Sequence, residues 1–480
     1  MFKKIISTAL LATVALCGYT QSSLTVDFNT VTKEGVRKGA SSANLCWLLD
    51  SDKHRPNKTQ SMASALQEVG VGALRFPYGH LANNYLWHTP PYNDTKKGLR
   101  PAVAAKGTIP GEWDWAVAKD GSFKSAMDFD EYIDLCESQG IAPLVVVNCM
   151  SHKYAGGPTV AELAECAAEW VRYAQKKRYK VRYWQIGNEM DHHPKIISME
   201  EYVDVYVEIA SAMKAVDPSV QIAPGILGKA NYLTAVYNRA PELVDFTTAH
   251  QYMWKFIEEN KTYDKWSVAN TNYIPNIEKM QEAVDKTDKK DMEILITETG
   301  VSPSNKGMGN INNTYKSLWW FEVLMREMSV RNVSYIFFWG THSPWKGEFD
   351  DENDDIALWF RVDDNSRKPT AEISRFVNAN LRNDFVETTC DDSSLRLFAM
   401  SDSDKQSGSI FVMNKLKTPK KVTISMEGLP SSVKTMTTQS VGGKNPYSRT
   451  LEYAKSQTAR VENGVIEVTI PALSVVNLSY

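Results

Sequence analysis

The chain has 480 residues, of which 43% are hydrophobic and 23% charged, and its net charge is −3. These figures fit an ordinary soluble globular protein with enough chain for one large domain and a smaller one. The small net charge argues against a protein that binds nucleic acid or a membrane surface.

Residues 1–20 are typical of a signal peptide rather than of a folded domain. Lys3 and Lys4 precede an apolar run, residues 5–16, that is too short to span a membrane. Cys17 follows in a sequence that loosely resembles a bacterial lipobox, so lipidation there is the alternative to plain cleavage. We expect export to the periplasm, the cell surface or the medium, and no membrane-spanning segment elsewhere.

The other five cysteines lack Cys-x-x-Cys spacing, so a structural zinc site is not expected. Free, buried thiols are the favoured interpretation, and a disulfide is the alternative in an exported protein. The run Asp191-His192-His193 and the acidic run 350–355 fit no common zinc or calcium motif. Loops are the favoured interpretation of both runs, with calcium binding as the alternative for residues 350–355, so these spacings give no reason to expect a metal or organic cofactor.

Strands and helices alternate through residues 36–382. Runs of apolar and β-branched residues predict eight strands, at 43–49, 73–77, 143–148, 183–186, 221–226, 246–252, 293–300 and 333–339. Helical or helix-like segments follow at 58–69, 129–138, 159–177, 199–216, 232–237, 273–284, 315–328 and 370–380. Eight such units predict a (β/α)8 TIM barrel, with a doubly wound sheet as the alternative. Residues 78–125, rich in Pro, Gly and Trp, form a long insertion.

From about residue 384 the pattern changes to short alternating strands separated by Gly and Pro turns. This pattern predicts an all-β sandwich domain over residues 384–480. Residues 24–30, ahead of the barrel, are a candidate extra strand of that domain. The sequence thus predicts an α/β protein with a barrel over residues 36–382 and a C-terminal β-sandwich.

Two carboxylates occupy unusual places in this pattern. The buried strand Tyr183–Ile186 leads into Gly187, Asn188 and Glu189, and the strand over 293–300 carries Glu298 near its end. The carboxyl ends of barrel strands share one face, where catalytic residues lie, so the two side chains can meet there. Paired carboxylates are what cleavage of a glycosidic bond requires.

Other polar and aromatic side chains fall at the same end of the predicted strands. They are Arg75, Asn148, Asn188, His250, Tyr252 and Trp339. The alternatives are a buried ion pair for Arg75, a core histidine for His250 and simple packing for Trp339, but the shared position favours one site. The 13 Trp and 21 Tyr suit either core packing or a cleft in which rings stack on sugars.

Residues 184–191, with the sequence Trp-Gln-Ile-Gly-Asn-Glu-Met-Asp, resemble the acid/base segment of retaining clan-A glycoside hydrolases. Within that clan they look most like the α-L-arabinofuranosidases. Residues 297–300 are similar to the nucleophile strand of that group, residues 74–79 to its Arg-Tyr-Pro-Gly-Gly turn, and residues 250–252 to its His-x-Tyr segment. The resemblance covers roughly residues 40–380.

Two features depart from this resemblance. Tyr78 stands where these arabinofuranosidases usually have glycine, and a bulky ring beside the cleaved sugar is expected to change the sugar accepted. The long insertion carries Trp87, His88, Trp113 and Trp115. If the insertion forms walls around the site it indicates attack on chain ends, whereas an open groove indicates attack within a chain.

The resemblance implies a role for each carboxylate. Glu298 would be the nucleophile, kept ionised by Arg75 and Tyr252. Glu189 would be the general acid and then the base, with a raised pKa in the free enzyme. The two carboxyl groups would lie about 5–5.5 Å apart for a retaining reaction.

The resemblance also implies a substrate pocket. Asn188 would bind the substrate 2-OH and Trp339 would form the floor, while Asn148, His250 and Tyr78 complete the expected substrate-binding set. The expected protein is a secreted retaining hydrolase of plant or algal carbohydrate, most simply an exo-α-L-arabinofuranosidase. Alternatives are an endo-acting β-glycanase on galactan, agarose or xylan, a β-xylosidase or β-glucuronidase, a metal-dependent hydrolase and a non-catalytic carbohydrate-binding protein. The oligomeric state is not encoded.

Overall fold

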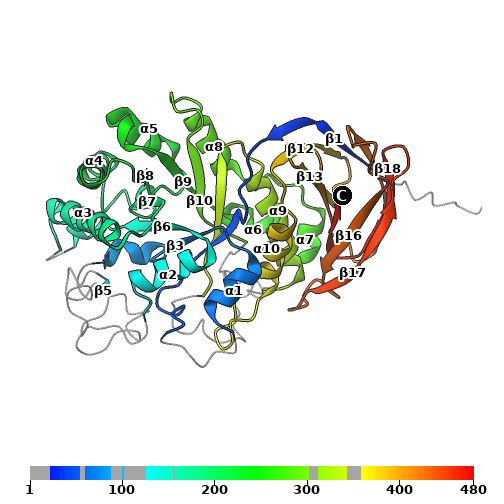
Figure 1. Cartoon of the computed structure of the whole chain (residues 1–480), viewed down its shortest axis with the longest axis horizontal. Helices are drawn as coiled ribbons and strands as arrows, with labels where there is room; N and C mark the ends of the chain where they lie inside the picture. Colours follow the sequence, from blue (N-terminus) through cyan, green and yellow to red (C-terminus); the bar gives the residue numbers. More distant parts are fainter. Residues whose placement is uncertain are drawn as a thin grey trace, which may run out of the picture.

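The computed structural model describes residues 22–53, 60–87, 100–101, 126–154, 157–301, 312–342 and 358–480. The expected signal segment with Cys17, most of the insertion with His88, Trp113 and Trp115, and the acidic run 350–355 lie outside the described residues. The described chain forms a body of strands and helices beside an all-β body (Figure 1).

The first body contains a barrel of eight parallel strands in the order β8-β7-β6-β3-β2-β11-β10-β9. In chain order they are β2 (Ser41–Asn44), β3 (Ala73–Phe76), β6 (Ala142–Val147), β7 (Tyr183–Ile186), β8 (Gln221–Pro224), β9 (Phe246–Tyr252), β10 (Glu293–Gly300) and β11 (Val333–Phe338). Hydrogen bonds link β8 to β9: Asp245 N donates to Ile222 O, and the Asp245 carboxylate accepts from Ile222 N. Thr248 Oγ1 donates to the carbonyl of Pro224, which has no N–H to continue a ladder. The predicted (β/α)8 barrel is confirmed.

Helices surround the barrel, and their bounds follow the predicted periodicity. They are α1 (Met62–Val69), α2 (Phe129–Gln139), α3 (Val160–Lys177), α4 (Met199–Val216), α5 (Ala230–Arg239), α8 (Pro275–Val284), α9 (Thr314–Met328) and α10 (Pro369–Asn380). At the start of α3, Thr159 and Glu162 exchange side-chain and backbone bonds in a capping box. The short helices α6 (Ile257–Asn260) and α7 (Tyr263–Val268) after β9 were not predicted, because they are too short to show a periodic pattern.

The remaining elements are single turns and a two-stranded ribbon. They are η1 (His80–Asn84), η3 (Ser151–Lys153), η4 (Met190–His192), η5 (Pro241–Leu243), η6 (Met253–Phe256), β4 (Tyr85–Leu86) and β5 (Arg100–Pro101). Two predicted boundaries of the barrel elements differ from the structure by more than two residues. The first strand ends at Asn44 rather than 49, because the chain turns through hydrogen bonds to Cys46 O. The first helix begins at Met62 rather than 58, where Ser61 caps it.

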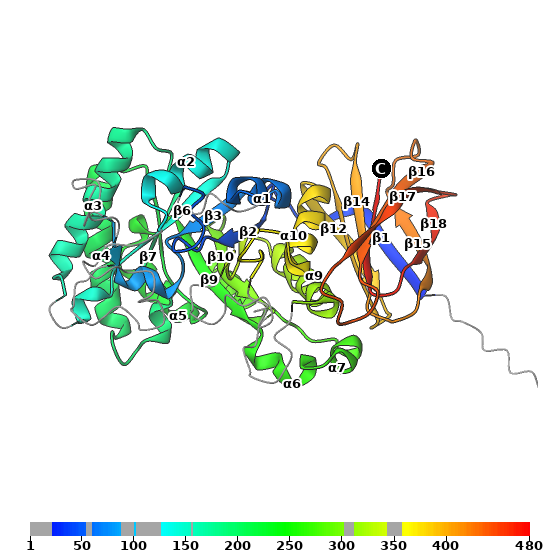
Figure 2. The same cartoon turned by 90° about the horizontal axis from the view of Figure 1, so that it is seen from below.

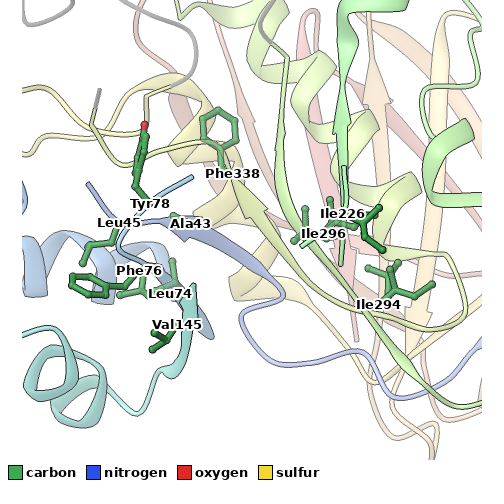
Figure 3. Packing of buried hydrophobic residues seen from close by; sticks show 14 of the residues in the cluster. Ala43, Leu45, Leu74, Phe76, Tyr78, Val145, Ile226, Ile294, Ile296 and Phe338 are labelled. Atoms are coloured by element: carbon green, nitrogen blue, oxygen red, sulfur yellow. The ribbon is translucent and has the colours of Figure 1, made fainter. Parts of the chain in front are cut away.

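Alternate side chains of the barrel strands face the helices and the barrel axis. Helix-facing side chains pack into the main core (Figure 3), among them Leu74, Phe76, Val145, Ile294 and Ile296. A separate apolar cluster is formed by the alternate positions, among them Leu144, Tyr183, Phe246, Leu295 and Phe337. At the carboxyl ends of the strands, the alternate positions that follow this cluster are polar. The polar side chains at the mouth of the barrel therefore lie directly on the apolar cluster.

The second body is a nine-stranded sheet in the order β17-β16-β19-β14-β13-β12-β1-β15-β18. Its strands are β1 (Ser22–Lys33), β12 (Asp384–Cys390), β13 (Leu395–Ser401), β14 (Gly408–Asn414), β15 (Lys420–Glu427), β16 (Thr435–Gly442), β17 (Glu452–Arg460), β18 (Val465–Ile470) and β19 (Ser474–Ser479). β1 pairs with β12 and β15, so a segment ahead of the barrel belongs to this sheet. The sheet curls over one apolar core until β17 and β18 approach each other (Figure 2). The expected β-sandwich therefore has both layers in one continuous sheet.

Helix α9 joins the two bodies. Phe321 packs edge-on against Phe398 of β13 and also contacts Phe411 of β14. Glu322, which is fully buried, forms an ion pair with Arg396 of β13. Because α9 follows the strand that carries Glu298, this interface supports the barrel close to the predicted site.

Two expectations about the whole chain can be compared with the structure. The five cysteines of the described chain are free thiols, and four of them are buried. Among the described helices, none combines the length and apolar character needed to cross a membrane.

Candidate active site

Glu298 lies beside an irregularity in β10, at the mouth of the barrel. Ile296 pairs with Ala249 of β9, and Glu298 pairs with the next residue, His250. Thr297 is therefore an extra residue of β10. A bulge of this kind changes the direction of the side chains that follow it. Thr297 can therefore bond to His250 while Glu298 also points into the barrel mouth.

Both carboxylate oxygens of Glu298 accept hydrogen bonds. Arg75 Nη1 donates to Oε1 and the Tyr252 hydroxyl donates to Oε2, each over 2.8 Å. The fully buried Arg75 guanidinium also donates to Asn44 Oδ1 over 2.8 Å and to Asn188 Oδ1 over 2.6 Å. A buried cation and a phenol donor are suitable hydrogen-bond partners for a carboxylate, the group that would act as the nucleophile. Burial, and then the Glu298 charge, raises the pKa of Tyr252, so this hydroxyl stays a donor.

Glu189 follows β7 with its backbone in the left-handed region, at φ 53°. For a residue with a side chain this conformation costs roughly 1–3 kcal/mol, and such strain is concentrated at functional sites. Its carboxyl is largely buried, and burial raises its pKa. A carboxyl that holds its proton to higher pH is suited to act as a general acid.

His250 is fully buried between the two carboxyl groups. Its Nδ1 lies 2.8 Å from Glu189 Oε1 and 3.6 Å from Glu298 Oε2, and its Nε2 lies 3.0 Å from Thr297 Oγ1. Burial lowers the pKa of His250 to about 4, so the ring is neutral at neutral pH. A ring that donates from Nδ1 to Glu189 and accepts at Nε2 from Thr297 satisfies both contacts. It leaves the second Glu189 oxygen to carry the acidic proton.

One oxygen of Glu189, one of Glu298 and a ring nitrogen of His250 all lie within 4.8 Å of one another. This spacing fits a retaining pair, at about 5–5.5 Å, better than an inverting pair, which needs roughly 6.5–9.5 Å to admit water. By distance alone the three groups could also surround a metal ion. Both Glu298 oxygens are already engaged, however, and one of them contacts the Arg75 cation. This donor set suits an anionic nucleophile better than a metal centre.

Trp339, directly after β11, contributes an aromatic wall. Its ring centre lies 6.2 Å from that of Tyr252 and 4.7 Å from that of Tyr78. Trp339 is partly exposed, whereas Tyr78 is fully buried and its hydroxyl donates to His342 O over 3.2 Å. Tyr78 therefore packs against Trp339 from the buried side of that ring. Its φ of 114° agrees with the glycine usual at this position in the resembled family.

Asn188 and Asn148 follow neighbouring strands but differ in their contacts. Asn188 accepts from Arg75, which also donates to Glu298. Asn148 Oδ1 instead accepts from the N–H groups of Met150 and Ser151, at 3.0 and 3.1 Å, and so caps the turn after β6. Its amide nitrogen is buried and has no hydrogen-bond partner among the described residues. The described contacts do not connect Asn148 to either carboxylate.

Three residues of the site were not predicted. Asn44 accepts from Arg75 and donates to Thr297 O over 2.9 Å, and Gln185 Oε1 accepts from Arg75 Nε over 3.2 Å. Thr297 contacts His250, as described above. The predicted first strand spans residues 43–49, so Asn44 lies inside it rather than at its carboxyl end, and nothing marks it as a site residue. Gln185 did carry a signal, since it is the polar residue of a buried strand.

In the Asp-His-His run after β7, the aspartate Asp191 has a structural use. The Asp191 carboxylate accepts from the backbone N–H groups of Leu227, Gly228 and Lys229, at 2.7 to 2.9 Å. These bonds hold the loop after β8 against the loop that follows Glu189. They account for the aspartate without a metal.

Part of the chain is similar in sequence to known proteins. The family model described as the alpha-L-arabinofuranosidase 1 domain matches residues 65–268. The intracellular exo-α-(1→5)-L-arabinofuranosidase of Streptomyces lividans is 27% identical over 214 residues, which are 40% of this chain and 30% of that protein. The intracellular exo-α-L-arabinofuranosidase of Bacteroides ovatus is 24% identical over 266 residues, which are 49% of this chain and 47% of that protein. The match thus spans less than half of the length of these curated relatives.

Solved structures share the fold over nearly the whole chain. The GH51 α-L-arabinofuranosidase of Thermotoga petrophila has a TM-score of 0.68 at 17% identity, with 96% of this chain and 100% of that chain covered. The α-L-arabinofuranosidase of Thermotoga maritima has a TM-score of 0.69 at 16% identity, with 96% and 99% covered. At such identities the likeness shows the fold of the barrel and the β domain. The fold and the partial sequence match together show a chain that resembles the α-L-arabinofuranosidases.

Proposed function

We propose that this protein is a retaining exo-α-L-arabinofuranosidase that acts by double displacement. The observation that carries the proposal is the Glu189–Glu298 pair, in which one oxygen of each carboxyl group lies within 4.8 Å of the other. One carboxyl is engaged by a buried arginine and a tyrosine, and burial raises the pKa of the other. Two carboxyls in such different environments divide the roles of nucleophile and acid. The names of the curated relatives support the sugar and the exo mode of attack.

In the first step Glu298 bonds to the anomeric carbon while the bond from that carbon to the leaving oxygen breaks. Glu189 gives its proton to that oxygen. In the second step a water attacks the same carbon, Glu189 takes the proton from the water, and the bond to Glu298 breaks. Arg75 and Tyr252 stabilise the Glu298 carboxylate as it is released. Two inversions at one carbon leave the anomeric configuration unchanged.

Export and action on arabinose-containing plant polysaccharide or oligosaccharide are part of the same proposal. The support for export is the signal-like sequence of residues 1–20, with Cys17 as a candidate lipidation site, and the names of the curated relatives support the sugar. The curated relatives cited above are named intracellular, so the proposed location differs from theirs. Cell fractionation with N-terminal sequencing of the mature protein tests this. A protein found in the cytosol with residues 1–20 intact would contradict export.

The reaction is tested by an NMR time course with purified protein. The panel contains the 4-nitrophenyl α-L-arabinofuranoside, β-xyloside, β-galactoside and β-glucuronide, together with arabinan, arabinoxylan and agarose. Release of arabinose that first appears with the configuration of the substrate supports the proposal. If oligosaccharides appear from a polymer while the aryl glycosides are not hydrolysed, the protein is instead an endo-acting β-glycanase. Binding without turnover, unchanged by Glu298→Ala, would instead indicate a carbohydrate-binding protein.

A further inference from the structure

A third carboxyl lies behind the candidate nucleophile, and the proposed reaction does not use it. Glu327 of α9 is fully buried, and its Oε1 lies 2.8 Å from Thr299 Oγ1. Thr299 is the residue after Glu298. Its hydroxyl also lies 2.9 Å from the carbonyl oxygen of Gln251, the residue before Tyr252 on β9. Glu327 is therefore linked to both strands that shape the nucleophile's surroundings.

The hydrogen bonds of the Thr299 hydroxyl determine whether the Glu327 carboxyl is protonated. The hydroxyl has one hydrogen, and the Gln251 carbonyl can only accept, so the Thr299 hydrogen belongs to that bond. The 2.8 Å contact with Glu327 then needs a hydrogen from the carboxyl. Burial raises the pKa of Glu327 well above its usual value, which agrees with a neutral acid. A carboxylate there would leave a buried charge with a single hydroxyl for support.

Thr299 is a junction between three elements at the level of the nucleophile. Its hydroxyl bonds β10 to β9, its carbonyl accepts from Trp339 N over 2.8 Å, and Glu327 fixes it to α9. The register of β10 against β9 slips just before Glu298. The ladder is interrupted at this slip and resumes at Glu298 over a short stretch, so the side-chain bonds of Thr299 add to the few backbone bonds that hold this end of the strand.

We propose that Glu327 is a positioning residue that, as a neutral donor, holds Thr299 and thereby aligns Glu298 and Trp339 with β9. It does not touch the substrate, and the inference rests on the proposed glycosidase function for its kinetic readout. Loss of the bond lets the end of β10 shift relative to Arg75 and Tyr252. A misplacement of about 1 Å in a catalytic group costs on the order of 100-fold in rate.

The test compares two replacements of similar size. Glu327→Gln keeps a neutral donor toward Thr299, and Glu327→Leu removes it. We expect kcat on the aryl arabinofuranoside to stay within about twofold for Gln and to fall about 10- to 100-fold for Leu, with little change in KM. Glu322→Gln is the control, because Glu322 is equally buried on the same helix but pairs with Arg396 of the other body. It is expected to lower the Tm without lowering kcat per folded molecule.

A spectroscopic readout separates this inference from the proposed function. Infrared difference spectra of wild type against Glu327→Gln at neutral pH should show the loss of one protonated carboxylic-acid C=O band. Loss of a carboxylate band instead would overturn the inference, whether or not the protein hydrolyses glycosides. Equal kcat losses in Gln and Leu, or a Leu variant that is merely less stable, would also overturn it. Absence of arabinofuranosidase activity in wild type with the acid band present would overturn only the proposed function.

Discussion

Gly79 and Glu298 lie so close together that no side chain fits between them. A β-carbon built on Gly79 would lie 2.6 Å from Glu298 Oε1 and 3.0 Å from Trp339 Cζ3. The turn after β3 therefore presents bare backbone to the candidate nucleophile. Glycine is required here by this close approach.

Gly79→Ala is expected to lower kcat about 100-fold or more, because the methyl group pushes Glu298 away from its two donors. The matched control is Gly300→Ala at the end of β10, where the nearest atoms to a new β-carbon lie 3.9 Å away, in ordinary contact. We expect that control to keep kcat within about threefold. Steady-state kinetics with a Tm for each variant checks both. Equal losses in the two variants would show that the contact with Glu298 is not the cause.

The buried acid Glu189 is expected to make stability fall as pH rises. Burial raises its pKa above the unfolded value, so its contribution to stability is present at low pH and lost as pH rises through the folded pKa. Each unit of such a shift corresponds to about 1.4 kcal/mol. Glu189→Gln stays neutral and should therefore have a higher Tm than wild type near pH 8. Below about pH 4, where glutamate is protonated in both states, the two should converge.

The control for this pH dependence is Glu201, whose pKa is lowered, chiefly by its hydrogen bond from Lys153. A lowered pKa gives stability that is present above the unfolded pKa and lost as pH falls, which is the opposite sign. Glu201→Gln should thus melt at or below the wild-type temperature at neutral pH. Thermal melts at several pH values measure both variants. A higher Tm for Glu201→Gln, or no gain for Glu189→Gln, would contradict the burial argument.

The sequence predicts the barrel well because each of its units carries a local signal. The strand Phe246–Tyr252 and the helix Met199–Val216 have the bounds that their apolar patterns predict. The capping box at Thr159 is equally local, since both partners lie within four residues. These features depend on near neighbours in the chain, which a single sequence displays directly.

Contacts between distant segments are the part that one sequence does not display. Asn44 meets Arg75 only because β2 and β3 are neighbours in the sheet. Glu327 lies on a helix that is buried on nearly every side, yet in the sequence it resembles the polar face of an amphipathic helix. The slip in β10 shifts register by one residue, which the run of apolar letters does not show.

Arg75 and Glu298 form an ion pair with both side chains buried, at 0% and 3% exposure. Removal of one partner leaves the other as an uncompensated buried charge, at a cost of about 3–5 kcal/mol. Arg75→Met is therefore expected to lose about that much unfolding free energy and nearly all activity. The double variant with Glu298→Gln has no unpaired charge, so it should be more stable than Arg75→Met while remaining inactive. Urea denaturation checks this, and simply additive losses would contradict it.

Two opposing effects determine how Tyr78→Gly changes the free energy of unfolding. Glycine relieves the backbone strain at φ 114°, worth roughly 1–3 kcal/mol. Loss of a fully buried aromatic ring costs about 3–5 kcal/mol, so we expect a net loss of about 2 kcal/mol. Tyr78→Phe keeps the ring and removes the hydrogen bond to His342 O, at a cost of about 1 kcal/mol. Denaturation curves should rank wild type, Phe and Gly in that order.

The same pair of variants tests whether Tyr78 shapes the sugar pocket. Its ring lies 4.7 Å from that of Trp339, so removal of the Tyr78 ring lets Trp339 tilt back and widens the pocket. Tyr78→Gly should raise KM for the aryl arabinofuranoside about tenfold, the loss of roughly 1.4 kcal/mol of binding. The loss should be smaller for the bulkier six-membered β-xyloside and β-galactoside, so the ratio of kcat/KM values shifts toward them. Tyr78→Phe keeps the ring and should keep the wild-type ratio. A ratio unchanged in Tyr78→Gly, despite the loss of stability, would show that the ring serves the fold and not the choice of sugar.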